Sequence, residues 1–173
     1  MVSQLKVNEI IKQSGSSITI GEDGDTVSGP FTNVPAFSVG LSGNQDISNN
    51  TTTKITWDSE VYDTDNAFAS NKFTVPTGKG GKYLFEMVIQ IEYGNGAGEY
   101  GELKLRVNGS DSKVIRRAVS GNASVAQSIV LVATVNLSAC DYVEGFMLHT
   151  KGATQAIQAG VDTYFSGHRL IGA

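Results

Sequence analysis

The sequence predicts an all-β protein, a two-layer sandwich built from short strands. Apolar and polar residues alternate along several segments, most regularly over residues 82–93 and 103–107, as they do in strands that bury one face. Glycine, asparagine and serine separate these segments, and the 20 glycines of the 173-residue chain serve the turns between them. No apolar pattern with a period of 3.6 residues is sustained long enough to predict a substantial helix. A chain of this length is expected to bury roughly 70% of the surface of its unfolded state.

The first expected strands follow Pro35. Residues 36–41 are a short apolar run, and Ser42-Gly43-Asn44 ends it with turn residues. In residues 54–58 the alternation places Ile55 and Trp57 on one face, which predicts a second strand with those two side chains in the core.

The clearest strand is expected over residues 82–93. Its inward face would carry Tyr83, Phe85, Met87, Ile89, Ile91 and Tyr93. Residues 103–107 repeat the pattern, and Asn108-Gly109 predicts a tight hairpin turn before Val114-Ile115.

Residues 128–137 are apolar on both faces, unlike the strands before them. Ile129, Leu131, Ala133, Val135 and Leu137 alternate with Val130, Val132 and Thr134. Such a strand is expected to be covered on both sides. We expect the sandwich core on one side and a neighbouring subunit on the other. Residues 142–150 and 161–171 complete the strands.

The composition argues against several functional classes. A net charge of -4 and a pI near 5.1 do not suit a nucleic-acid binder, which needs a basic stripe, and Arg116-Arg117 is too small a cluster to supply one. No segment approaches the roughly 20 apolar residues that cross a bilayer, and no signal-peptide run is found in residues 1–20. We therefore expect synthesis in the cytoplasm without membrane insertion. The single Cys140 cannot form an intramolecular disulfide and is expected to be buried.

Several short phrases follow one another in a fixed order along residues 34–173. They are Pro35-Ala36-Phe37-Ser38-Val39, Ile55-Thr56-Trp57-Asp58, Phe73-Thr74-Val75-Pro76, Gly81-Lys82-Tyr83-Leu84-Phe85, Leu103 to Gly109, and Phe165-Ser166-Gly167 with Leu170-Ile171. Together they resemble the C1q-like branch of the C1q/tumour-necrosis-factor jelly rolls. The resemblance implies a jelly-roll β-sandwich that forms homotrimers, binds other molecules and catalyses nothing. No collagen-like Gly-x-y repeat precedes these residues, which departs from the secreted animal members.

Residues 1–33 differ in composition from the rest of the chain and predict a short extended arm. They hold too few apolar side chains for a core of their own, so we expect them to pack against a partner. Gln4 to Ile10, Ser16 to Gly21 and Gly24 to Val27 look like the amino-terminal segments of tailed-phage fibre and virion surface proteins. The expected partner-binding side chains of the arm are Leu5, Val7, Ile10, Ile11, Ile18 and Ile20.

The two resemblances together predict a bacteriophage virion structural protein. It would be a fibre, decoration or cement protein of the head or tail, with a homotrimeric C1q-like domain on the particle surface and residues 1–33 attached to other virion proteins. Attachment to a glycan or protein of the host surface is a further expectation. The alternative is a free C1q-like recognition module that binds a carbohydrate or protein ligand.

Two sets of residues are candidate sites. Asp58, Glu60, Asp63 and Asp65 are the densest acidic cluster, which could be a solvated loop or a calcium site, since calcium takes carboxylate ligands from loops. The glycine-rich segment 94–101 predicts an exposed recognition loop with Asn95, Glu99 and Tyr100 as candidate contacts. No other cofactor is expected.

No catalytic residues are predicted. Only His149 and His168 could act as bases near neutral pH, and each falls within an expected strand without an acidic neighbour to orient it. One cysteine and two histidines are also too few for a zinc site of the usual kind. The sequence therefore favours a binding or structural protein over an enzyme.

Overall fold

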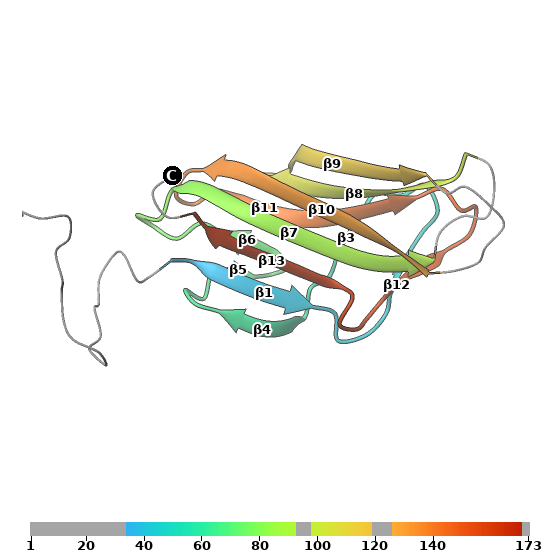
Figure 1. Ribbon diagram of the computed structural model, residues 1–173, viewed down its shortest axis with the longest axis horizontal. Helices are drawn as coiled ribbons and strands as arrows, with labels where there is room; N and C mark the ends of the chain where they lie inside the picture. The colour runs from blue at the N-terminus through green and yellow to red at the C-terminus, as the bar shows by residue number, and fades with distance from the viewer. Residues whose placement is uncertain (1–33, 93–97, 119–125, 171–173) are drawn as a thin grey trace, which may run out of the picture.

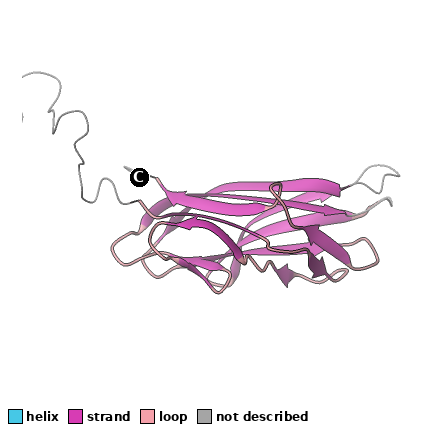
Figure 2. Cartoon of the chain, turned by 90° about the horizontal axis from the view of Figure 1, so that it is seen from below, coloured by secondary structure: helices cyan, strands magenta, loops and turns pink. Residues whose placement is uncertain are grey.

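The computed structural model of the chain describes residues 34–92, 98–118 and 126–170. In these ranges the chain forms β-strands and no helix (Figure 1), so the described residues contain no helix that could cross a membrane. The strands make two antiparallel sheets packed face to face (Figure 2). The expected arm, residues 1–33, lies outside the described residues.

The first sheet has seven strands and is organised around its longest member, β7 (Gly81–Glu92). One edge of β7 pairs along its whole length with β10 (Ala126–Leu137). The other edge pairs first with β13 and then with β12. The remaining strands extend the sheet beyond these two, in the order β2 (Gln45–Ile47), β12 (Gln155–Gln158), β7, β13 (Tyr164–Arg169), β1 (Ala36–Gly40) and β4 (Ser59–Asp63).

The second sheet has six strands, with β11 (Tyr142–His149) at its centre. One edge of β11 pairs with β8 (Tyr100–Val107), which in turn pairs with the edge strand β9 (Ser110–Ala118). The other edge pairs with β6 (Lys72–Thr74), which pairs with β5 (Phe68–Ala69), and with the short β3 (Thr53–Lys54).

Alternation along β7 determines which of its side chains reach the core, as predicted. Tyr83, Phe85, Met87, Ile89 and Ile91 are all fully buried. Tyr93 lies outside the described residues. The predicted hairpin also forms: Asn108 and Gly109 both have positive φ, at 50° and 80°, between β8 and β9. Two positive φ angles in succession match the twist of the strands that a two-residue turn joins.

An aromatic cluster fills the centre of the sandwich. The ring of Phe37 stacks on Phe73 at 4.9 Å and meets Phe165 edge-on at 5.0 Å, while Phe85 lies within 6.3 Å of it. These four rings come from strands of both sheets, and all are buried. The two layers are therefore joined by ring contacts between segments far apart in the sequence.

Two sequence predictions of local structure are wrong. Ile55 and Trp57 are buried as expected, but residues 55–58 are not a strand, because only Thr53 and Lys54 pair with β11. Cys140 is exposed, contrary to the prediction of a buried thiol. It occupies a turn after β10 with φ at 71°, and the geometry of that turn outweighs the tendency of cysteine to be buried.

Both ends of the described chain lie at the same end of the sandwich. Ala36 pairs with His168 where β1 begins and β13 ends, and the Arg169 amide donates a hydrogen bond to the Pro35 carbonyl at 3.0 Å. The turns 42–44 and 160–163 lie at the far ends of those two strands.

Gly167 is required by the aromatic cluster. A Cβ atom at this position would lie 2.5 Å from Cδ1 of Phe85 and 2.9 Å from Cε1 of Phe37. We expect Gly167→Ala to lower the free energy of unfolding by about 1–3 kcal/mol, the usual cost of overpacking a core. Urea denaturation measures this change. Gly43→Ala is the matched control, because a Cβ there meets nothing within 4 Å, and an equal loss in both variants would contradict the prediction.

Candidate association surface

The outward face of the seven-stranded sheet carries exposed apolar side chains interspersed with small polar residues. Strand register places Val132, Glu86, Ser166, Ser38 and Tyr62 in one row across β10, β7, β13, β1 and β4. The neighbouring row contains Val130, Val88, Tyr164, Gly40 and Ser59. We call this surface the seven-stranded face.

The sequence predicted that both faces of β10 would be covered, and this is confirmed for the face toward the core. Ile129, Leu131, Ala133 and Leu137 are buried in the core. On the other side, Val130 is 44% exposed and Val132 is 58% exposed. No described residue covers these two valines, and covering by a neighbouring subunit remains a prediction.

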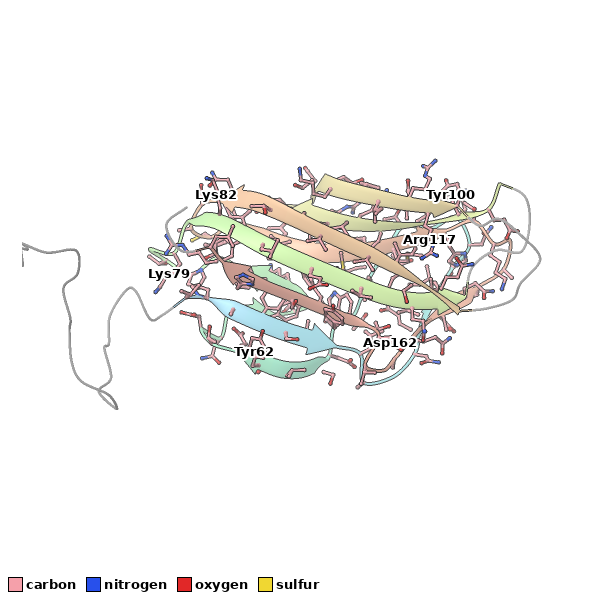
Figure 3. All side chains as sticks on the ribbon, viewed as in Figure 1. Tyr62, Lys79, Lys82, Tyr100, Arg117 and Asp162 are labelled. Carbon is pink, nitrogen blue, oxygen red and sulfur yellow. The ribbon has the colours of Figure 1, made fainter. Side chains whose placement is uncertain are left out.

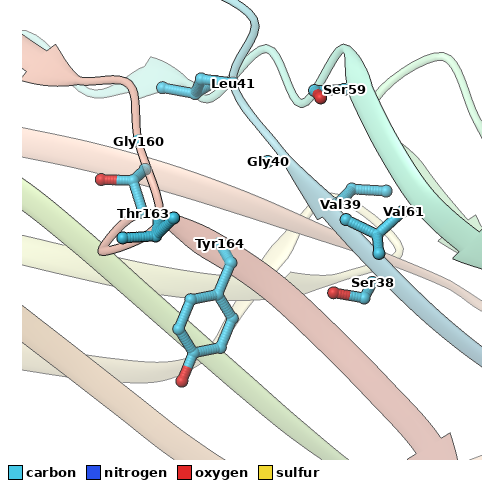
Figure 4. A pocket seen from close by; sticks show the side chains of 10 residues that line it. Ser38, Val39, Gly40, Leu41, Ser59, Val61, Gly160, Thr163 and Tyr164 are labelled. Atoms are coloured by element: carbon cyan, nitrogen blue, oxygen red, sulfur yellow. The ribbon is translucent and has the colours of Figure 1, made fainter.

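A groove of about 470 Å³ lies at one end of the seven-stranded face (Figure 4). Its floor is formed by the small residues Ser38, Gly40 and Ser59, which leave space above the sheet, and Tyr164 forms one wall. Val61 on β4 and Val161 in the turn before β13 also line it, with 73% and 93% of their surface exposed. The groove is thus bordered by the most exposed valines of the described chain.

One carboxylate lies in these two rows. Glu86 on β7 accepts a hydrogen bond from the Tyr164 hydroxyl at 2.9 Å, and no cation of the described residues pairs with it. Burial raises the pKa of Tyr164, and the hydrogen bond to the Glu86 carboxylate raises it further. The tyrosine therefore stays a neutral donor, and the carboxylate is held in place on the face.

Strand β9 is exposed on both of its faces along its whole length. Val114 and Ile115, adjacent and therefore on opposite faces, are 48% and 39% exposed. Among the described strands it pairs with β8 alone, so it is the edge strand of the six-stranded sheet. The Arg117 guanidinium donates a hydrogen bond to the Ser128 carbonyl of β10, which links the open edges of the two sheets.

The outward face of the six-stranded sheet, the six-stranded face, is different because its charges compensate one another. Lys54 pairs with Glu144 at 2.7 Å, Arg106 pairs with Asp111 at 2.5 Å and Arg116 pairs with Glu102 at 2.6 Å. Lys104 lies between two of these pairs, 3.5 Å from Glu102 and 3.4 Å from Asp111. Each carboxylate of this network is within ion-pair distance of a cation.

Cations also cover the aromatic rings of the six-stranded face. Arg106 lies 4.2 Å from the centre of the Phe146 ring, and Arg116 lies 4.0 Å from that of Tyr100. Lys72 lies 4.6 Å from the centre of the Tyr142 ring. Rings covered in this way expose charge rather than carbon to water. This is the organisation of a solvated surface.

The four acidic residues of the predicted calcium site are used in different ways. Asp58 accepts two hydrogen bonds from Ser42, at 2.8 and 2.6 Å. Asp63 accepts bonds from the Phe68 and Asp65 amides and so holds a turn. Glu60 is exposed on β4. No group of three or more His, Cys, Asp or Glu suited to a metal ion occurs within residues 34–92, 98–118 and 126–170, so calcium stays a prediction.

The predicted recognition loop is described only in part. Asn95 lies outside the described residues. Tyr100 begins β8, and its amide is held by the Thr150 hydroxyl at 3.0 Å, while Arg116 covers its ring. Glu99 precedes it and is half-buried. These positions place Glu99 and Tyr100 at one end of the sandwich without testing whether they contact a ligand.

The two histidines lie in different environments. His149 is fully buried, and its Nε2 lies 2.8 Å from the Ile47 carbonyl while its Nδ1 accepts from the Lys151 amide at 3.3 Å. The ring thus joins β11 to β2. His168 is exposed on β13. In the described residues neither histidine lies within hydrogen-bond distance of a carboxylate.

The sequence did not point to Val61, Val161, Glu86 or Tyr164 as surface-forming residues. Each lies in a segment that reads simply as strand or turn, and only the pairing of β1 with β4 and β13 brings them onto one face. Glu86 alone gave a usable signal, because it is an outward carboxylate between two apolar neighbours in the alternation of residues 82–93.

The same architecture occurs in solved structures. The chain is similar to the globular domain of a zebrafish complement 1qA protein, with 19% identity, a TM-score of 0.54, and coverage of 79% of this chain and 97% of that one. It is similar to murine APRIL, with 11% identity, a TM-score of 0.56 and coverage of 80% and 100%. It is also similar to the Eiger TNF of S. frugiperda, with 14% identity, a TM-score of 0.53 and coverage of 81% and 93%.

The fold is therefore a C1q/TNF-like jelly roll, as the sequence predicted. At identities of this size the likeness establishes the fold alone. No protein-family model and no curated protein matches the sequence.

The Asp58 carboxylate gives a test of how the loops are held. The hydrogen bonds from Ser42, first that of its hydroxyl and then that of its amide, lower the pKa of Asp58 from the ordinary 3.8. A carboxyl with a lowered folded pKa stabilises the fold above the ordinary value, and this contribution is lost as the pH falls through the folded pKa. We expect Asp58→Asn to lower the urea midpoint at pH 6 and to leave it unchanged at pH 2.

Asp46→Asn is the matched control for this measurement, since the Asp46 side chain makes no hydrogen bond to a described residue and lies near Asp58 in the same polar hollow. Its midpoint should equal that of the unaltered protein at both pH values. A deficit of Asp58→Asn that is as large at pH 2 as at pH 6 would contradict the assignment.

Proposed function

We propose that the protein is a structural protein of a bacteriophage particle, displayed on the virion surface as a homotrimer of C1q/TNF-like jelly rolls. The fold supports a role in binding and assembly rather than in turnover. In this proposal residues 1–33 attach the trimer to another virion protein. The ends of the domain away from that attachment are then available to a host-surface glycan or protein.

The contrast between the two outward faces carries the self-association part of the proposal. The six-stranded face neutralises its own carboxylates with Lys54, Lys104, Arg106 and Arg116. The seven-stranded face presents Val130, Val132, Val61 and Val161 instead, and among the described residues its Glu86 has no cation partner. Large exposed apolar side chains gathered on one face favour an interaction site there. We assign the seven-stranded face to contacts between copies.

The number of copies follows from the resemblance of residues 34–173 to C1q-like domains, which implies three. A closed ring of three identical subunits buries the same two surface patches three times and leaves no apolar patch open. Three copies of each distal loop are then displayed together. Repeated display raises functional affinity through effective concentration, so each individual contact can be weak.

The virion assignment is supported by the first 33 residues. Gln4 to Ile10 and Ser16 to Gly21 look like the attachment segments of phage surface proteins. A free recognition module with the same fold is the competing proposal. The two differ in what residues 1–33 are needed for.

Val132→Lys tests the association face. An ammonium group buried in an interface without a partner costs about 3 kcal/mol or more, so we expect association to weaken by roughly 100-fold or more. Analytical ultracentrifugation of the full chain should show a trimer, and the variant should sediment as a monomer with an unchanged circular dichroism spectrum. Val132 is 58% exposed in the single chain, so the fold itself should tolerate the change.

Ala153→Lys is the control for that experiment, because Ala153 is an exposed residue in the bend between β11 and β12, away from the rows of the seven-stranded face. It should assemble normally. A trimeric Val132→Lys variant, or an unaltered chain that is monomeric at micromolar concentration, would overturn the proposal.

Deletion of residues 1–33 separates the virion role from the free recognition module. Particles that lack the protein should rebind the full chain and fail to rebind the deleted chain, while both chains should still form trimers. Cosedimentation with the particles measures rebinding. If the deleted chain rebinds as well as the full chain, residues 1–33 are not the anchor and the free module becomes the better account.

A further inference from the structure

The two sheets leave an opening along one side of the sandwich. β4 is an edge strand of the seven-stranded sheet, and β5 is an edge strand of the six-stranded sheet. The Phe68 amide of β5 donates a hydrogen bond to the Asp63 carboxylate of β4 at 2.7 Å, which joins the two edges. Phe68 also lines a cavity of about 180 Å³ between them, which we call the edge pocket. This is the long side of the molecule that carries Tyr62, opposite the side that carries β9 (Figure 3).

The inner wall of the edge pocket is apolar and aromatic. It is formed by Val39, Trp57 and Phe68. Val39 and Trp57 are core residues, only 1% and 3% exposed, so the pocket reaches the core of the sandwich. Phe68 is partly buried and packs against the same core. The faces of aromatic rings carry partial negative charge and attract cations.

Two carboxylates, those of Asp58 and Glu60, line the same pocket. Glu60 is paired with the core residue Val39, so it lies on the inward side of β4, toward the other sheet. The hydrogen bonds from Ser42 lower the pKa of Asp58, which keeps this carboxylate ionised at neutral pH. Among the described residues, neither carboxylate has a cation within ion-pair distance.

Lys54 does not compensate this charge. Its ammonium group donates a hydrogen bond to the carbonyl of Ser70, a residue of the pocket, at 3.0 Å. The same group is paired with Glu144 of the six-stranded face at 2.7 Å, so its charge is already matched there. The edge pocket therefore combines an apolar, aromatic wall with two carboxylates that retain their charge.

We propose that the edge pocket binds the side chain of a lysine from a partner polypeptide. The carbon stem of the lysine packs against Val39, Trp57 and Phe68, and its ammonium group is attracted by Asp58 and Glu60. An ammonium group suits the site better than a guanidinium group. Both oxygens of Asp58 already accept hydrogen bonds from Ser42 and are not free to accept the two parallel bonds of a guanidinium.

The position of the pocket favours a polypeptide as the source of the cation. The outer edge of β4 pairs with no other described strand, so a chain beside the pocket would find backbone groups to bond. An inward charge on an edge strand also discourages aggregation, but Glu60 alone would serve that role, without a second carboxylate or an aromatic wall. The inference goes beyond the proposed function and requires neither a trimer nor a virion.

Trp57 is the only tryptophan of the chain, so its fluorescence reports directly on the edge pocket. N-acetyl-lysine methylamide, titrated into the full chain at constant ionic strength, should change the Trp57 emission saturably. The dissociation constant should be on the order of 1–10 mM, as befits so small a ligand. The same compound acetylated on its Nζ carries no charge and should leave the emission unchanged. N-acetyl-arginine methylamide should bind roughly threefold more weakly or worse.

Glu60→Gln removes one charge from the pocket with little change in shape, and it should weaken the binding of the lysine compound by about threefold to fivefold. Glu60 is exposed, so the fold should tolerate the change, and the urea midpoint checks this. Asp162→Asn is the matched control, because it removes an equal charge from an exposed turn that does not line the pocket. It should bind as the unaltered chain does.

Four results would each overturn the assignment: no saturable change in emission, equal binding of the acetylated compound, equal binding of the arginine compound, or unweakened binding by Glu60→Gln. Each of these measurements is made on a single pocket of one chain. Such a result would therefore leave the proposed trimer and the virion role standing, and a monomeric chain would leave the edge pocket standing.

Discussion

A two-layer sandwich can cover only one face of each of its sheets. Here the inward faces meet through the rings of Phe37, Phe73, Phe85 and Phe165. The two outward faces differ in the side chains that they present to their surroundings. The outward face of the six-stranded sheet is suited to contact with water, because its charges are paired and cations cover its aromatic rings. The seven-stranded sheet leaves valines exposed beside small residues, so burial of this face against a partner would lower its free energy.

The sheet edges follow from the same constraint. β9 is an exposed edge strand of the six-stranded sheet, and an edge strand is a site where other chains can add. Lys113, Arg116 and Arg117 supply the charge that discourages indiscriminate pairing at such an edge.

Sequence reasoning found the long strands and the core because each residue in them obeys a local rule. Alternation in residues 82–93 correctly predicted that the inward side chains from Tyr83 to Ile91 are buried, and Asn108-Gly109 correctly predicted a hairpin turn. Trp57 was placed in the core but in the wrong local structure, since burial does not require strand pairing. Cys140 was misplaced because a turn with positive φ depends on what the chain does on either side of it. The groove could not be foreseen, because Val61 and Val161 are 100 residues apart and meet only through the register of β4, β1 and β13.

The pairing of Ala36 with His168 gives the molecule a polarity that its sheets alone would not have. Polypeptide that continues from Val34 and from Leu170 departs from one pole, while the turns around Gly43 and Asp162 occupy the other. A domain with this arrangement can be attached to a support next to Val34 or Leu170 while the turns around Gly43 and Asp162 stay accessible. A peptide to be displayed at the end opposite Val34 and Leu170 would accordingly have to be inserted into the turns around Gly43 and Asp162.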